Sequence, residues 1–324
     1  DNCNNYVITV PGVTYSGGDK TAPSLTGTAY AGTTGTNACM SDASTAAPFN
    51  AASAVTGYTD NCGGAVTATL TNTSVTGTDC SWTVTYTFKV SDACGNELTG
   101  QSYSNTGGDK TPPTLTGTFP TGQINMNLCY SAIPAGPSES DIAALYTDNC
   151  GGSITVVKTG TPTGDDCSWS VTYNYTVRDN CNNYVITVPG VTYSGGDKTP
   201  PAVSAPGAIT LEACGTSDID NPLIVGHSGL AYSTTSTTIT LAQFTSEGGT
   251  ATDNCSIASI SYSDAITTAG PCPIVVTRTF VIMDPCGNPT TVTQTITIDD
   301  TTPPAVSAPG AITLEACGTS DIDN

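Results

Sequence analysis

The chain has 324 residues, of which only 10% are charged, and its 27 Asp and Glu residues against 7 Lys and Arg give a net charge of −20. This balance argues against nucleic acid and anionic membrane as partners, and the carboxylates offer oxygen ligands to hard cations such as calcium. The longest apolar runs, YVITV and TFVIM, are far shorter than the ~20 residues that span a bilayer, so we expect no membrane insertion.

Internal repeats set the organisation of the chain. Residues 1–21 recur letter for letter at 179–199, and residues 199–221 recur at 302–324. A shared DKTAP, DKTPP or DTTPP element opens each repeat, with starts 90, 88 and 103 residues apart, which fits immunoglobulin-sized units. We therefore expect a fragment of a preceding module at 1–18, module one at 19–108, module two at 109–196, module three at 197–299 and a fragment of a following module at 300–324.

The strand from Cys80 to Val90 is the clearest predicted element of module one. Its apolar residues alternate with Ser, Thr and Lys at a strict period of two, which predicts a strand with one buried face. We expect the tryptophan of this face, Trp82, and its counterpart Trp169 to pack in the core. A TDNC turn and a strand precede this element in each module, and a DxCGN or DNCNN turn and a Thr-rich strand follow it.

Module three differs from the other two in two places. Arg278 interrupts the apolar face of its central strand, and we expect the stem of this side chain to reach the rim of the sandwich. The interval between the first two cysteines is 41 residues, against 23 and 21 in the other modules, so residues 215–251 are predicted to form an inserted loop or hairpin. Only SESDIAALY and ITLAQFTSE could form a helical turn or two. The fold class is all-β, with tandem immunoglobulin-like β-sandwich modules in an extended array.

Fourteen regularly spaced cysteines and a single histidine favour disulfides over zinc sites, which usually draw on His or CxxC pairs. A strand of about 12 residues would hold Cys80 and Cys94 roughly 40 Å apart, so these two cannot pair. We favour first-to-third and second-to-fourth pairing within each module, although first-to-fourth with second-to-third stays open. The favoured pairs are Cys39 with Cys80, Cys62 with Cys94, Cys129 with Cys167, Cys150 with Cys181, Cys214 with Cys272 and Cys255 with Cys286.

Three acidic elements of each module are expected to meet at one end of the sandwich. Their carboxylate, amide and backbone oxygens suit calcium, which takes 6 to 8 oxygen ligands. The alternative is ordinary turn chemistry, because Asp and Asn side chains also cap turns, and a lysine after the linker Asp could neutralise part of each cluster. The residues are Asp19, Asp60, Asn61, Asp92 and Asn96 in module one, Asp109, Asp148, Asn149, Asp179 and Asn183 in module two, and Asp197, Asp253, Asn254, Asp284 and Asn288 in module three.

The DNC, DxCGN and DxTPP punctuation resembles the HYR-like, immunoglobulin-type repeats of giant Bacteroidota cell-surface adhesins, including the gliding-motility type. The resemblance implies an extended stalk or filament outside the cell and carries over no catalytic residues, and His227 is the chain's one histidine. Its partners would be further repeats of the same chain or identical neighbouring chains. The cysteines also predict an oxidising compartment, meaning extracellular or at the cell surface.

The leading hypothesis is therefore a structural stalk of a secreted adhesin or extracellular filament, not an enzyme. The alternative is a calcium-dependent array that binds surface glycans through its loops. Under the stalk hypothesis Cys3 and Cys317 bond to cysteines outside this sequence, and residues 1–18 and 305–324 form ordered edges of incomplete modules.

Overall fold

The computed structural model describes residues 12, 15–270, 272–311 and 313. The chain forms two compact units. The first unit comprises residues 1–122, 135–161 and 171–192, and the second comprises residues 123–134, 162–170 and 193–324. None of the helices in the described residues has the length and hydropathy that a bilayer crossing needs. Cys3, Cys317 and the terminal side chains expected to pack lie outside the described residues. The described residues 15–18 and 305–311 are exposed and form no strand, so the expected ordered edges are not seen there.

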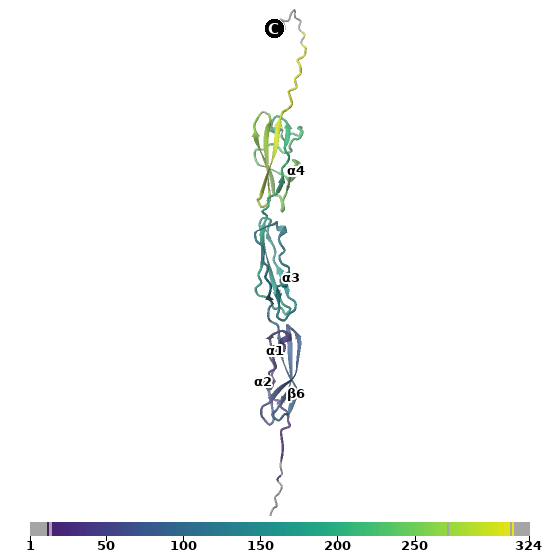
Figure 1. Ribbon diagram of the computed structural model, residues 1–324, viewed down its shortest axis with the longest axis vertical. Helices are drawn as coiled ribbons and strands as arrows, with labels where there is room; N and C mark the ends of the chain where they lie inside the picture. The colour runs from purple at the N-terminus through teal and green to yellow at the C-terminus, as the bar shows by residue number, and fades with distance from the viewer. Residues whose placement is uncertain (1–11, 13–14, 271, 312, 314–324) are drawn as a thin grey trace, which may run out of the picture. The chain divides into compact units, whose positions relative to one another are not determined.

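Module one supplies most of the first unit. Its larger sheet has the order β2-β6-β5-β4, formed by β2 (Thr36–Asn37), β4 (Thr67–Thr78), β5 (Ser81–Ser91) and β6 (Glu97–Gly108). The pairs are antiparallel except for β2 with β6. A second, two-stranded sheet joins β1 (Ser24–Leu25) to β3 (Tyr58–Thr59). The short η1 (Met40–Asp42), α1 (Ala43–Ala46) and α2 (Ala51–Ala54) lie between the first two cysteines, in the purple part of the chain in Figure 1.

The core of module one lies on the predicted inner face of β5. Every second residue of this strand is buried, from Trp82 through Tyr86 to Val90, while the intervening Thr and Ser residues are partly exposed. Tyr58 and Tyr103 complete this cluster, together with Ala43 of α1, Ala54 of α2 and Ala47. The Trp82 indole donates to the carbonyl oxygen of Ala38 at 2.8 Å, which ties the segment that leads into Cys39 to the core.

The rest of the first unit comes from module two. The strands β7 (Thr114–Leu115) and β9 (Tyr146–Thr147) form a small sheet, and β10 (Thr155–Thr159) pairs with the later residues of β12 (Trp169–Arg178). The helix α3 (Glu139–Ala143) forms within SESDIAALY, where Ser138 and Asp141 make a capping box. Strand order in the larger sheet of this module is β10-β12-β13-β8, with β11 (Thr163–Gly164) also on β12.

The second unit contains the remainder of module two and all of module three. Strand β8 (Met126–Asn127) runs parallel to β13 (Val191–Gly196), and η2 (Tyr130–Ala132) follows Cys129. Module three has a five-stranded sheet of order β15-β20-β19-β18-β16 and a two-stranded sheet of β14 with β17. The strands are β14 (Ala202–Ser204), β15 (Ile209–Glu212), β16 (Thr237–Ile239), β17 (Thr250–Thr252), β18 (Ser259–Thr268), β19 (Ile274–Met283) and β20 (Pro289–Asp299).

The predicted all-β class with tandem immunoglobulin-like sandwiches is confirmed, but two local predictions for module three need correction. Residues 215–251 are more than a loop, because they form η3 (Thr216–Asp218), the edge strand β16 and the helix α4 (Leu241–Ser246), which begins at a capping box of Thr240 and Gln243. The side chain of Arg278 does not reach the rim. It is 0% exposed and binds Asp264 of β18 through two hydrogen bonds of 2.8 and 2.9 Å, which supply the charge partner that burial requires.

Candidate functional site: the junctions between modules

All four disulfides in the described residues join one predicted module to the next. Cys39 bonds to Cys150 and Cys80 to Cys181 in the first unit, while Cys129 bonds to Cys255 and Cys167 to Cys286 in the second. Their Cα atoms are 4.9 to 5.5 Å apart, within the normal range for a disulfide. The predicted pairing within modules is therefore wrong: first cysteines bond to second cysteines of the following module, and third cysteines to fourth.

The physical reason for this pairing is the absence of a spacer between modules. The backbone N–H of Asp109, the first residue of module two, donates to the carbonyl oxygen of Asp79 at 2.7 Å, so module two begins beside Cys80. The carboxylate of Asp79 also accepts the N–H of Met40 at 2.8 Å, which holds Cys39 at the same end of module one. Both cysteines thereby face the turns of the next module.

The second junction repeats this arrangement with Asp166 in place of Asp79. The N–H of Asp197 donates to the carbonyl oxygen of Asp166 at 2.7 Å, and the Asp166 carboxylate accepts the N–H of Tyr130 at 2.8 Å. Neither Asp79 nor Asp166 was singled out from the sequence. The signal that could have found them is an acidic residue directly before the third cysteine, in TDC of module one and DDC of module two.

The TDNC turn brings the second cysteine to the junction. In module two the carboxylate of Asp148 accepts the N–H of Cys150 at 2.9 Å, and the amide of Asn149 donates to the sulfur of Cys39 at 3.4 Å. In module three Asp253 accepts the N–H of Cys255 at 2.8 Å, and Asn254 donates to the sulfur of Cys129 at 3.3 Å. Each turn thus holds its own cysteine and contacts the sulfur to which that cysteine is bonded.

The fourth cysteine sits in a second turn that is closed by an Asp and an Asn. Asp179 accepts the N–H groups of Cys181 and Asn183 with one oxygen and the Asn183 amide with the other, at 2.7 to 2.9 Å. Asp92 with Asn96 and Asp284 with Asn288 make equivalent bonds. Burial alone would raise the pKa of Asp284, but hydrogen bonds from Asn288, Cys286 and Gly287 outweigh it and lower the pKa. The carboxylates of these three aspartates therefore cap backbone N–H groups within their own turns.

The linker aspartates and the TDNC aspartates form a different set. An oxygen of Asp197 and an oxygen of Asp253 lie within 4.8 Å of each other, and Asp109 with Asp148 and Asp19 with Asp60 are arranged alike. Asp197 is only 4% exposed, yet its Oδ2 has no hydrogen-bond partner, and neither has Oδ2 of Asp253. Buried carboxylate oxygens rarely lack a partner, so this pair is unsatisfied as it stands.

At the first junction, the crowding of buried carboxylates also shifts a pKa. Burial, followed by the negative charges of Asp109 and Asp179, raises the pKa of Asp148 above its usual value, and its Oδ1 is buried without a partner. Asn183 relieves part of the charge by donating to Oδ2 of Asp109 at 3.4 Å. Carboxylates packed this closely favour a cation or a proton between them.

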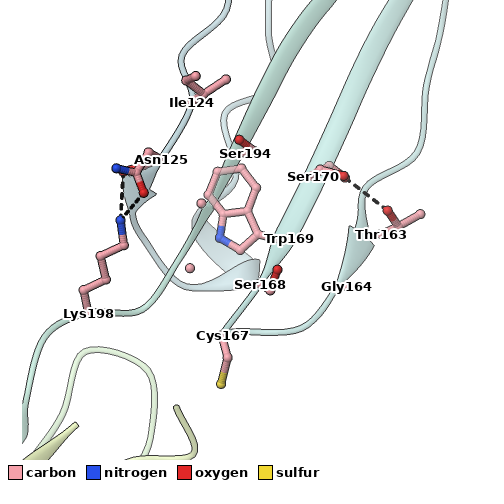
Figure 2. A pocket seen from close by; sticks show the side chains of 12 residues that line it. Ile124, Asn125, Thr163, Gly164, Cys167, Ser168, Trp169, Ser170, Ser194 and Lys198 are labelled. Atoms are coloured by element: carbon pink, nitrogen blue, oxygen red, sulfur yellow. Dashed lines mark hydrogen bonds between the residues drawn. The ribbon is translucent and has the colours of Figure 1, made fainter. Parts of the chain in front are cut away.

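The lysines after the linker aspartates do not supply this positive charge. Lys110 donates to the carbonyl oxygen of Gly35 at 2.7 Å, and Lys198 turns to Asn125, as Figure 2 shows. Within the described part of the chain, the ion pairs are Lys89 with Glu97 and Arg278 with Asp264, both away from the junctions. The junction carboxylates therefore have no ion-pair partner among these residues.

A hollow beside the second junction has no exposed aromatic ring on which a sugar could stack. It measures about 540 Å³ and is lined by Trp169, Lys198 and small polar residues (Figure 2). Trp169 is only 2% exposed, because its indole packs inward and donates to the carbonyl oxygen of Leu128 at 2.8 Å. As the sequence suggested for both tryptophans, this ring serves the core.

Four cysteines lack a disulfide partner among the described residues: Cys62, Cys94, Cys214 and Cys272. All four are exposed. The first two are the second and fourth cysteines of module one, and the last two are the first and third cysteines of module three.

No family model matches the chain. Among curated proteins, it is 32% identical over 234 residues to hyalin of Lytechinus variegatus, in a match that covers 69% of this chain and 38% of hyalin. Among solved structures, the protocadherin gamma B2 extracellular cadherin domains 1–5 match at 10% identity with a TM-score of 0.23, covering 74% of this chain and 53% of that one. Protocadherin gammaB7 EC3-6 also matches at 10% identity with a TM-score of 0.23, covering 72% of this chain and 66% of that one.

Proposed function

We propose that the chain is part of a structural stalk of a secreted adhesin or extracellular filament, in which disulfides fasten each module to the next. The observation that carries this proposal is the pairing itself, because every disulfide in the described residues crosses from one predicted module to the following one. Bonds inside a module would stabilise that module alone. Bonds between modules resist their separation, which is what a fibre under tension needs.

Several further observations support an extracellular and non-catalytic role. Disulfides persist in oxidising compartments, and the distant relative hyalin is matched over 69% of this chain. At the junctions, the Asn149 and Asn254 amides contact the cystines and Asp179 and Asp284 make turn bonds. The glycan-binding alternative has less support, because the hollow beside Trp169 exposes no aromatic face.

Stretching single molecules from both termini tests the stalk proposal. With the disulfides intact, the shortest covalent path runs to Cys39, crosses to Cys150, continues to Cys167 and crosses to Cys286. This path contains about 96 residues, so full extension should stop near roughly 340 Å, against about 1,100 Å for the reduced chain at ~3.5 Å per residue. An oxidised chain that extends to the reduced length would overturn the proposal.

Paired variants separate the bonds of one junction. Cys39→Ser alone should raise this limit to roughly 470 Å, because the path through Cys80–Cys181 and Cys167–Cys286 is about 134 residues long. Cys39→Ser with Cys80→Ser should open the junction and lengthen the path to about 200 residues, or roughly 700 Å. Either bond therefore still limits the extension when the other is lost, and the junction opens fully only in the double variant.

We also propose that the junction carboxylates bind calcium. The donors are hard oxygens, as calcium prefers, and the buried Oδ2 atoms of Asp197 and Asp253 have no other partner. Bound there, the ion would neutralise the carboxylates and link the first residue of a module to its own TDNC turn. Asp109 with Asp148 and Asp19 with Asp60 would hold ions in the same way.

Calorimetric titration of the EDTA-treated chain with calcium tests this site. We expect binding, a rise in melting temperature by mass action, and the loss of one site per chain in the Asp197→Asn/Asp253→Asn variant. Asp220→Asn is the matched control, since it removes an exposed charge of module three outside the junction. Equal binding by the junction variant and the control would refute the site while leaving the disulfide stalk untouched.

A further inference from the structure

Cys62 and Cys94, the exposed second and fourth cysteines of module one, lie in the same kinds of turn as the bonded second and fourth cysteines of modules two and three. The carboxylate of Asp60 accepts the N–H of Cys62 at 2.9 Å, as Asp148 does for Cys150. The Asn61 amide donates to the sulfur of Cys62 at 3.5 Å, as Asn149 does to Cys150 at 3.1 Å. The second turn is matched too.

In that second turn Asp92 accepts the N–H of Cys94 at 2.8 Å, as Asp179 does for Cys181 at 2.7 Å. The residue after the cysteine has a positive φ in both, 88° at Gly95 and 68° at Asn182, so the backbone follows the same course. At the other two places where this pair of turns occurs, both cysteines are bonded to the first and third cysteines of another module.

We propose that the end of module one that carries Cys62 and Cys94 is a docking surface for another module of this repeat, which a second copy of the chain can present through Cys214 and Cys272. This inference rests on the proposed stalk function and names the partner of its open ends. The order of the observed bonds fixes the register: Cys62 takes the first cysteine, Cys214, and Cys94 takes the third, Cys272.

The acidic residues at this end also match those of a closed junction, which supports a second module as the occupant. Asp19 and Asp60 bring two carboxylates to this end, and Oδ1 of Asp60 is buried without a partner, as Oδ1 of Asp148 is at the closed junction. A closed junction adds contacts that the open end lacks, such as the Asn149 amide bonded to the sulfur of Cys39 at 3.4 Å. Asn61 is placed to make the same contact with an incoming first cysteine.

Each link forms one S–S bond from two thiols, and oxidised glutathione can act as the oxidant. A cysteine thiolate attacks the glutathione disulfide and releases one glutathione, and the thiolate of the second copy then displaces the other. The two cysteines lose two electrons and two protons in total, and one glutathione disulfide becomes two glutathione thiols.

Mixed isotopic copies of the full chain test the docking surface. The chain carries Cys3→Ser and Cys317→Ser so that the described thiols alone react, and equal amounts of ¹⁴N and ¹⁵N protein are incubated with oxidised glutathione. We expect species that grow in steps of one 32.7 kDa chain, and mixed-isotope peptides that join Cys62 to Cys214 and Cys94 to Cys272. Cys62→Ser/Cys94→Ser should leave the protein monomeric.

Several results would overturn the docking proposal. These are monomers with glutathione on the exposed cysteines, a Cys62–Cys94 bond within one copy, or Cys62 joined to Cys272 as often as to Cys214. The same digest reports the four junction disulfides as an internal reference. Their absence would refute the stalk proposal itself, whereas their presence without links between copies would refute this inference alone.

Discussion

Modules one and three solve the same packing problem with different side chains. At the centre of the inner strand face, module one has Tyr86 and module three has Arg278. The Tyr86 hydroxyl donates to the carbonyl oxygens of Ala47 at 2.8 Å and Ser44 at 3.2 Å, and so holds the segment that follows the first cysteine.

Arg278 holds the corresponding segment of module three with more bonds. It donates to Ser228 at 2.7 Å and to the carbonyl oxygens of Leu230 and Ala231 at 3.0 Å. Ser228 in turn donates to Glu247 at 2.7 Å, at the end of α4. The longer excursion of module three is therefore anchored by a buried charge network, whereas neutral groups hold the shorter segment of module one, where the Asn105 amide also donates to the carbonyl oxygen of Ala47 at 3.0 Å.

The largest expected effect comes from removing the buried charge of Arg278. Arg278→Met should destabilise module three by about 3 to 5 kcal/mol, because it leaves Asp264 buried without its ion-pair partner. Hydrogen exchange read by mass spectrometry on β18 and β19 peptides should show the loss, with β5 peptides of module one as the internal reference. A change below about 1 kcal/mol would mean that water or another group takes the place of Arg278.

A double variant sharpens this result. Asp264→Leu added to Arg278→Met removes the stranded carboxylate, so it should recover part of the lost stability, although the N–H of Ser233 loses its acceptor on Asp264. If the losses in unfolding free energy of the two single variants simply add in the double variant, Arg278 and Asp264 do not act as a unit and the anchoring network is not cooperative.

Tyr86→Phe is the matched change in module one, and it should lower the stability of its module far less than Arg278→Met lowers that of module three. It removes one hydroxyl and its two carbonyl contacts while keeping the ring in the core, so we expect a loss of about 0.5 to 1.5 kcal/mol. The same exchange experiment measures it on β5 and α1 peptides. A loss as large as that of Arg278→Met would contradict the difference between the two anchors.

Sequence periodicity predicted the strands of both modules but not the fate of the polar residue within them. The alternation along β5 and β19 is local, and the structure follows it. Whether Arg278 lies at the rim or in the core depends on Asp264, which is 14 residues away on β18, and spacing along the chain does not reveal that contact. The helical turns α3 and α4 formed in the two segments that the sequence singled out, but α1 and α2 of module one were not predicted.

The candidate site was predicted in composition but not in connectivity. The sequence identified the cysteines and the acidic turns. It also predicted that the linker and TDNC aspartates lie close together, as Asp197 and Asp253 do. The disulfide pairing was missed because it depends on how closely one module follows another. That closeness comes from the hydrogen bond between Asp109 and Asp79, a contact between main-chain groups with no signature in spacing.

The smallest expected effect concerns the point at which the chain leaves each module. In module one the side chain of Asn37 accepts the N–H of Lys110 at 2.8 Å, whereas in module three Glu212 accepts the N–H groups of Thr301 and Thr302 at 2.8 and 3.0 Å. Only the carboxylate can titrate. Hydrogen bonds from Thr301, and then from Thr302, lower the pKa of Glu212 from 4.5 to about 2.

The direction of the pH effect at Glu212 follows from this lowered pKa. A carboxyl group whose pKa falls on folding stabilises the fold above its unfolded value of 4.5, and that contribution is lost as the pH falls towards about 2. The NMR shift of the Thr301 amide should therefore stay constant down to mild acid and then change with a midpoint near 2. Glu212→Gln, which mimics the amide of module one, should abolish the step with little change in stability, since Glu212 is exposed. A midpoint near 4.5 would show that the carboxylate does not hold the exit segment in solution.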